Sequence, residues 1–299
     1  MSEPFSNVMA EVLSHTIDEI QLRCRDNELD LSELDQRLTI KFHEEGYDRL
    51  ATQSDLGYSY IDFQLKTLQS GNCTVQGELA PCSFYIKLAY MGLVSDNGGA
   101  QIVDLPSPRI ANVGLMIVVR YQTQPYLLAQ IKGNAIDRNQ LLIAAVAGSV
   151  DIPDMNASDP LVAALARETS EELGVACGEL NLSPFHYVIS EWETGNINHT
   201  CVARNANLNE ILNCFLTRTE LALQVDSDRA NLEVAALALV PLNGKACGTK
   251  LNDIITYAPE DGDIRTSIES YGLTSYTIAI IRHLQQADHR YCLLERSGL

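Results

Sequence analysis

Basic residues are scarce in this chain. Lysine and arginine together number 21, against 39 aspartates and glutamates, which leaves a formal net charge of −18 and a pI near 4.6. A surface this negative repels other polyanions, so it argues against a nucleic-acid polymer or an anionic membrane as a partner. The same charge disfavours a phosphate-rich small molecule unless metal ions lie between it and the protein.

Long apolar runs and metal-type cysteine spacings are also missing. No run approaches the roughly 20 apolar residues that span a bilayer, and the first residues lack the basic and apolar regions of a signal peptide. No C-x-x-C pair occurs, and no cysteine–histidine spacing is typical of a zinc site. We therefore expect a cytoplasmic protein whose cysteines are reduced and mostly buried. The eight cysteines are Cys24, Cys73, Cys82, Cys177, Cys201, Cys214, Cys247 and Cys292.

The length of 299 residues and the hydrophobic content of 46% predict a sizeable core, and either two domains or one domain with a sizeable extension. A turn signal at 96–99 and a Pro-Ser-Pro break at 106–108 place the boundary. We expect a smaller α+β N-terminal domain over 1–107, of unknown role, followed by an α/β domain over 108–299. Neither part contains a repeat or a low-complexity tract.

The N-terminal tract has a mixed pattern. Apolar residues in 6–25 recur at spacings typical of an amphipathic helix. A capping-box-like start near Ser32 predicts a second helix. Alternating or aromatic segments at 38–42, 58–63 and 83–88 predict strands.

The second domain has a more regular order. The segments 112–120 and 125–132 predict a hairpin, and the apolar run 141–147 predicts a buried strand that ends at Gly148. A loop then leads to a helix over 160–173. Further strands are expected at 185–193, 198–203 and 233–242, with helices at 208–224 and about 274–286.

The helix over 160–173 carries the strongest local signals. Asp159 or Ser158 can cap its N-terminus, Pro160 suits the first helical position, and Gly174 is a natural stop. Its apolar residues, which can anchor it in a core, are Leu161, Leu165 and Leu173.

Three carboxylates stand on one side of that helix. Glu168, Glu171 and Glu172 occupy positions i, i+3 and i+4, where like charges cost roughly 0.2–0.5 kcal/mol per pair. A solvated acidic face is the simplest interpretation. A glycine-containing loop just before the helix, however, could supply carbonyl oxygens next to the carboxylates, and oxygen ligands suit hard divalent cations.

These residues resemble the second half of the Nudix box, G-x5-E-x7-R-E-U-x-E-E-x-G-U, in which U is a bulky apolar residue. Three positions depart from it. Thr169 stands at an apolar position, Asp159 replaces the first glutamate, and the glycine is Gly148, which lengthens the loop by five residues. The matching positions are Arg167, Glu168, Glu171, Glu172, Gly174 and Val175.

The resemblance implies an α/β/α sandwich with a mixed sheet and a hydrolase that uses Mg²⁺ or Mn²⁺. Its substrate would be a nucleoside diphosphate derivative such as ADP-ribose, a nucleotide sugar or a dinucleotide, cleaved at the diphosphate linkage. Arg167 would tie the helix to the loop through Asp159 or a neighbouring acid. The implied metal ligands are Glu168, Glu171 and Glu172, with the carbonyl of Ala147 or Gly148.

The general base is less well defined by the sequence. Glu233, just before a predicted strand, is the best distal candidate, and Glu191 and Glu193 are weaker ones. His199 could contact a phosphate or a base, but a lone histidine on a strand is more often structural. The aromatic residues that could stack on a nucleobase, or pack in the core, are Tyr187 and Trp192.

Two other functions remain open. A Nudix-like module could bind a nucleotide or a partner without catalysis. An isomerase of the isopentenyl diphosphate type shares the fold, but its catalytic cysteine and glutamate are not recognisable here. The oligomeric state is also open, and a homodimer could form through 1–105.

Overall fold

The computed structural model describes a large part of the second predicted domain and several strands of the first. By contacts between Cα atoms the chain divides into two compact units. One comprises Met1–Val113, Ser149–Ala164 and Tyr187–His199; the other comprises Gly114–Gly148, Leu165–His186 and Thr200–Leu299. The domain ranges 1–107 and 108–299 stay a prediction. The described residues are 10–13, 17–24, 57–67, 73–82, 109–133, 142–144, 146–180, 182, 187–191, 197–203, 206–225, 232–242, 250–251, 254–259, 264–266, 271–274, 276–278 and 280–281.

In the first unit the predicted helix over 6–25 is wrong, because its described residues form two strands. Strand β1 (Ala10–Leu13) pairs with β9 (Tyr187–Glu191), and β2 (Ile17–Cys24) runs parallel to β4 (Cys73–Cys82). The apolar residues of β2 include an alternating set, Ile20, Leu22 and Cys24, that also fits a strand. Pairing with a distant segment decided between the two periodicities.

Only one of the other predictions in this unit falls on described residues. The strand at 58–63 is confirmed within β3 (Gly57–Thr67), which pairs antiparallel with β4. The predicted helix near Ser32 and the predicted strands at 38–42 and 83–88 lie outside the described residues.

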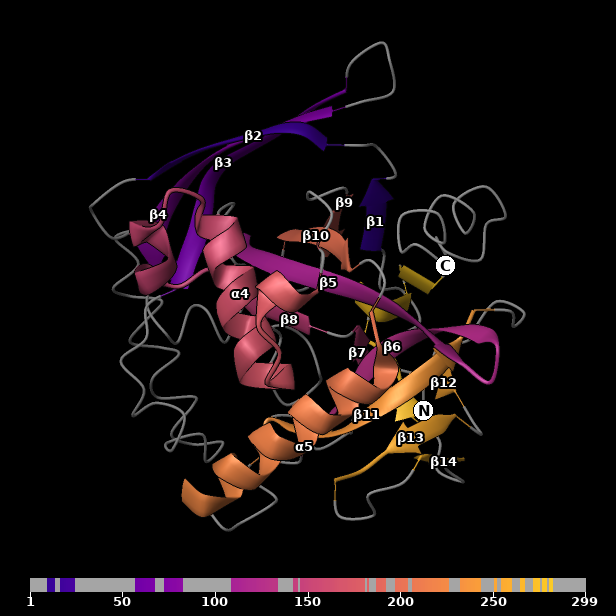
Figure 1. The fold of residues 1–299 in the computed structure, drawn as a ribbon. Helices are drawn as coiled ribbons and strands as arrows, with labels where there is room; N and C mark the ends of the chain where they lie inside the picture. The colour runs from indigo at the N-terminus through magenta and orange to yellow at the C-terminus, as the bar shows by residue number, and fades with distance from the viewer. Residues whose placement is uncertain are drawn as a thin grey trace, which may run out of the picture. The chain divides into compact units, whose positions relative to one another are not determined.

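The second unit is built on the predicted hairpin, which is confirmed. Strands β5 (Arg109–Tyr121) and β6 (Gln124–Lys132) pair in a register that sets Tyr121 opposite Gln124. The two turn residues, Gln122 and Thr123, have φ values of 48° and 69°. Positive φ at both central positions matches the right-handed twist of the flanking strands. Figure 1 shows the hairpin beside β11.

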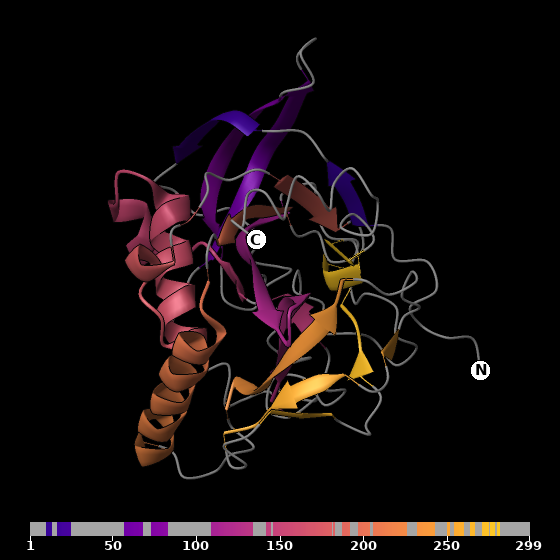
Figure 2. The same cartoon turned by 45° about the vertical axis from the view of Figure 1, so that its right-hand side comes forward.

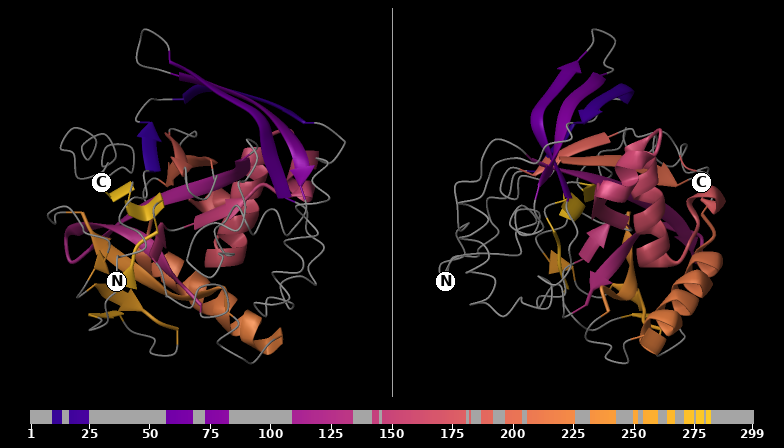
Figure 3. Two further views of the ribbon diagram at one scale, coloured as in Figure 1. Left: turned by 180° about the vertical axis from the view of Figure 1, so that it is seen from behind. Right: turned by 90° about the vertical axis from the view of Figure 1, so that its left-hand side faces the viewer.

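The sheet of this unit continues outward from the hairpin. Its order is β5-β6-β11-β13-β14, and the pairings within this series are antiparallel. The predicted strand at 233–242 is confirmed as β11, whose residues 236–240 are buried. Figure 3 shows these outer strands from two further directions. The strands are β11 (Val234–Pro241), β13 (Ile255–Tyr257) and β14 (Ile264–Thr266), with a separate pair β12 (Lys250–Leu251) and β15 (Tyr271–Gly272). With the parallel β2–β4 pair, the described pairing is mixed but mostly antiparallel.

The apolar run 141–147 is not one strand, as predicted, but two. Strand β7 (Leu142–Ala144) pairs with β6, whereas β8 (Val146–Ser149) pairs with β5. The run changes partner within a continuous apolar sequence, which contains no turn residue to mark the change.

Helix α4 (Pro160–Leu173) has the predicted bounds. The Asp159 carboxylate accepts a hydrogen bond from the Val162 backbone N–H at 3.2 Å, so Asp159 is the N-cap. Gly174, with φ of 72°, ends the helix in the left-handed region. The three leucines expected to anchor the helix are 0–2% exposed: Leu161, Leu165 and Leu173.

Helix α5 (Leu208–Val225) was also predicted, and it contacts the C-terminal end of α4 (Figure 2). A Cβ on Gly174 would lie 2.7 Å from the Cys214 carbonyl oxygen, so the backbone after α4 lies close to the backbone of α5. The Arg218 Nε–H donates to the Glu171 carbonyl oxygen at 2.5 Å, which satisfies an acceptor in the last turn of α4. These contacts hold the acidic part of α4 in place.

The remaining predicted elements are only partly described. Strand β10 (Ile197–Ala203) matches the expected strand, and residues 276–278 and 280–281 are helical within the expected last helix. The rest of that helix lies outside the described residues. Among the described helices, none is both long and apolar enough to cross a membrane.

Candidate functional site

Glu172 is the most enclosed acidic side chain of the candidate site, with an exposed fraction of 0%. Lys132 Nζ lies 2.6 Å from its Oε1, Gln130 Nε2 donates to Oε2 at 2.8 Å, and the Ala147 N–H donates to Oε2 at 3.3 Å. Lys132 and Gln130 are two residues apart on β6, so their side chains share one face of the strand. Glu172 thus joins helix α4 to strands β6 and β8.

The ammonium of Lys132 is held in its charged form. Burial alone would lower the pKa of Lys132, but Glu172 and Glu233 together raise it above its ordinary value. Burial raises the pKa of Glu172, and Lys132 opposes that rise. The pair therefore fits a buried salt bridge, in which each charge depends on the other.

Glu168 lies one turn earlier on α4 and is 8% exposed. Its carboxyl group sits against the backbone of Gly148, where a Cβ would lie 1.9 Å from Glu168 Cδ. Only glycine leaves room for the carboxylate at this point of β8. Burial and the neighbouring Glu172 raise the pKa of Glu168 to about 8, although Arg167 acts against the rise.

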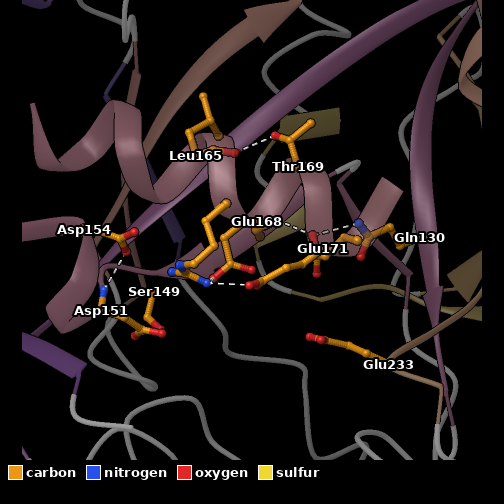
Figure 4. A network of polar contacts seen from close by, with 12 residues as sticks. Gln130, Ser149, Asp151, Asp154, Leu165, Glu168, Thr169, Glu171 and Glu233 are labelled. Atoms are coloured by element: carbon orange, nitrogen blue, oxygen red, sulfur yellow. Dashed lines mark hydrogen bonds and ion pairs between the residues drawn. The ribbon is translucent and has the colours of Figure 1, made fainter. Parts of the chain in front are cut away.

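Arg167 links two of the three carboxylates on this side of α4. Its guanidinium lies 2.8 Å from Glu168 Oε1 and 3.0 Å from Glu171 Oε2. Both acids lie on helix α4 itself, so the predicted tie from Arg167 to the loop stays a prediction. The Glu171 side chain is 55% exposed, so the three glutamates of one helical side differ sharply in burial. Figure 4 shows Glu168 and Glu171 together beneath the helix.

Glu233 enters the site from the opposite direction. It precedes β11, its side chain is 44% exposed, and its Oε1 lies 3.3 Å from Lys132 Nζ. In Figure 4 its carboxylate points from the strand toward the space below Glu168 and Glu171. The backbone is clamped here: the Gly133 N–H donates to the Glu233 carbonyl oxygen at 2.9 Å, and a Cβ on Gly133 would lie 1.7 Å from the Leu232 carbonyl oxygen.

The charges of this cluster do not cancel. With all four carboxylates ionised (Glu168, Glu171, Glu172, Glu233), two cations (Lys132, Arg167) oppose them, so 2 − 4 leaves a formal charge of −2. One divalent cation would neutralise that excess, and carboxylate oxygens are the ligands that Mg²⁺ and Mn²⁺ prefer.

The donor chemistry of these carboxylates therefore fits a hard divalent cation. Within the part of the chain that the structure describes, no group of three or more acidic, histidine or cysteine side chains is arranged to hold a metal ion. In this arrangement the carboxylates form ion pairs with Lys132 and Arg167. A cation would be held by Glu168 and Glu172, with Glu171 beside them, once Glu172 separates from Lys132.

Thr169, which departs from the apolar consensus, is completely buried. Its hydroxyl donates to the Leu165 carbonyl oxygen at 2.6 Å. A polar group at this position is therefore satisfied within the helix. The departure leaves the acidic face intact.

Other sequence candidates contribute less. His199 is buried on β10, and burial lowers its pKa to about 4, which favours a neutral, structural histidine. Only the backbone of Tyr187 and Glu191 is described, as part of β9. Trp192 and Glu193 lie outside the described residues.

Sequence reasoning missed Lys132 and Gln130. A signal was present, because two polar side chains at period two interrupt the otherwise apolar end of the 125–132 strand. Such residues on a buried strand need partners. The pattern does not reveal that the partner is Glu172.

No protein-family model matches the chain, and no curated protein matches it. Among solved structures, the chain is similar to a MutT/nudix family protein from Enterococcus faecalis, with 14% sequence identity and a TM-score of 0.34. The match covers 71% of this chain and 78% of that one. A likeness at this level assigns neither a fold nor a function.

The raised pKa of Glu168 predicts a specific pH dependence in metal-free buffer. A carboxyl whose pKa rises from 4.5 to about 8 on folding is stabilised in its protonated form. Its contribution to the free energy of unfolding is complete below the unfolded pKa and is lost as the pH rises through the folded value. Urea unfolding between pH 4.5 and 8 should therefore show wild type losing stability relative to Glu168→Gln. Glu171→Gln is the control, and a wild-type–Glu168→Gln difference independent of pH would contradict the prediction.

Proposed function

We propose that this protein is a Mg²⁺- or Mn²⁺-dependent hydrolase of the Nudix type. It cleaves the diphosphate linkage of a nucleoside diphosphate derivative. The observation that carries the proposal is the buried pair Glu168 and Glu172 on one side of α4, next to Gly148, in a cluster with an excess charge of −2. Two buried carboxylates one helical turn apart are costly when both are ionised, unless cations neutralise them.

A divalent cation bound there would offset the charge of the diphosphate and lower the pKa of its water. The residues of the chain supply the remaining parts. Glu168 and Glu172 hold the cation, Glu171 lies at the solvent side, and Arg167 orients Glu168. Glu233, whose side chain is 44% exposed, would accept a proton from the attacking water.

The substrate class follows from the Nudix resemblance and from charge. ADP-ribose, nucleotide sugars and dinucleotides all carry the diphosphate that such a site would cleave. Because the chain has a net charge of −18, a polyanionic substrate needs the cation for binding as well as for chemistry. A cytoplasmic location, the absence of nucleic-acid and membrane partners, and a homodimer belong to the same proposal.

One observation favours a second function. Lys132 already neutralises Glu172, with an Nζ–Oε1 distance of 2.6 Å. If that salt bridge is permanent, the site cannot take a cation at Glu172, and the chain would bind a nucleotide or a partner without hydrolysis.

Hydrolysis assays distinguish the two functions. Purified protein would be incubated with ADP-ribose, nucleotide sugars or dinucleotides in Mg²⁺, Mn²⁺ or EDTA, and nucleoside monophosphate release measured. We expect turnover of at least one class that EDTA abolishes and that Glu168→Gln and Glu172→Gln reduce strongly, with folding checked by circular dichroism. Arg120→Gln, an exposed substitution on the hairpin, is the matched control. Absence of turnover in every condition, with wild type equal to Glu172→Gln, would refute the hydrolase.

A further inference from the structure

Lys132 lies between two carboxylates that differ in exposure. Its Nζ is 2.6 Å from Glu172 and 3.3 Å from Glu233. The exposed fractions of the three side chains are 5% for Lys132, 0% for Glu172 and 44% for Glu233. The ammonium therefore has one buried partner and one partner open to solvent.

The backbone keeps this arrangement in place. Lys132 is the last residue of β6, opposite Val234 of β11, and the register shifts between Val234 and Ala236. Such an irregularity re-aims side chains locally. The Gly133 N–H bond to the Glu233 carbonyl then holds Glu233 next to Lys132 whichever acid the ammonium contacts.

We propose that Lys132 is an internal competitor of the divalent cation. It pairs with Glu172 when no cation is bound and transfers to Glu233 when a cation takes Glu172, and so it sets the cation affinity of the site. This inference rests on the proposed function, because it requires a cation site at Glu168 and Glu172.

Charge and hydrogen bonding make the exchange feasible. Ionised Glu172 is buried and needs a neighbouring cation, and either the ammonium or the divalent ion meets that need. The displaced ammonium is not left unpaired, because Glu233 already lies at 3.3 Å. Gln130 Nε2 and the Ala147 N–H stay available to Glu172 Oε2 in both states.

Mn²⁺ binding to the full-length protein tests the proposal without any substrate. The dissociation constant would be measured by electron paramagnetic resonance of free Mn²⁺ for wild type, Lys132→Gln, Glu233→Gln and the double variant. Lys132→Gln should bind about tenfold more tightly, equal to about 1.4 kcal/mol, because the competing charge is gone. Glu233→Gln should bind more weakly than wild type, and by a smaller factor when Lys132 is also replaced.

A second measurement covers the case in which Lys132→Gln folds poorly. The rise in melting temperature with added Mn²⁺ should be larger for Lys132→Gln than for wild type, because the ion then supplies the missing partner of Glu172. Arg120→Gln removes a positive charge from the far end of the hairpin, roughly 23 Å along β6 from Lys132, and should behave as wild type.

The outcomes separate the inference from the function. If Glu172→Gln abolishes Mn²⁺ binding but Lys132→Gln binds no more tightly than wild type, the competitor role is wrong and the cation site stands. If wild type and Glu172→Gln bind Mn²⁺ equally, or neither binds it, the cation site itself is wrong, and the inference fails with it.

Discussion

Replacing Glu172 with leucine is expected to lower the free energy of unfolding by about 3 kcal/mol, the low end of the cost of breaking a buried ion pair. The substitution leaves the Lys132 ammonium in a site where its side chain is 5% exposed. Glu233 remains within 3.3 Å, which keeps the cost from being larger. Urea unfolding followed by circular dichroism, in chelator, would measure it.

The neighbouring glutamate is a matched control. Glu171 precedes Glu172 on the same helix, but its side chain is 55% exposed and its ion pair with Arg167 faces solvent. Glu171→Leu should therefore cost less than about 1 kcal/mol. The double variant Glu172→Leu/Lys132→Met should recover most of the stability, because it removes both buried charges. Equal costs for the two single variants would show that burial of Glu172 does not matter.

Replacing Gly148 with alanine is expected to weaken Mn²⁺ binding by about 10–100-fold, the usual effect of disturbing the groups that orient a ligand. The new Cβ would lie 1.9–2.3 Å from the three carboxyl atoms of Glu168, so that carboxylate has to leave its position against β8. Because these atoms are the end of a flexible side chain, the free energy of unfolding should fall by no more than about 3 kcal/mol.

Gly178 offers the control for this substitution. A Cβ on Gly178 would meet no atom within 4 Å, so Gly178→Ala should leave Mn²⁺ binding unchanged. Both variants would be titrated with Mn²⁺ and unfolded in urea. Equal Mn²⁺ affinities for Gly148→Ala and Gly178→Ala would show that the position of the Glu168 carboxylate is unimportant for the cation.

Local signals predicted the helix that carries the site. Asp159 caps α4, Gly174 ends it, and the i, i+3, i+4 spacing predicted three glutamates on one side, all from contacts within a few residues. The hairpin β5–β6 followed in the same way from two apolar runs around a short turn. Such features depend on backbone geometry that neighbouring residues set by themselves.

Local signals gave wrong predictions where a segment pairs with residues far away in the sequence. The apolar pattern over 6–25 fits a helix, but its residues 17–24 pair with a strand more than fifty positions away, Ile17 opposite Cys73. The run 141–147 predicts a single strand, because a continuous apolar sequence does not show a change of partner.

The acidic stretch shows which features follow from the sequence and which follow only from the tertiary structure. The sequence by itself determined that Glu168, Glu171 and Glu172 share a side of one helix, since helical spacing is a local property. Only the tertiary structure decided that Glu172 is buried and contacts Lys132 and Gln130. The same holds for the contact of Glu168 with Gly148 and for the exposure of Glu171 to solvent. Burial and ion pairing arise where β6 and β8 pack against α4, and those strands come together with the helix only when the chain is folded.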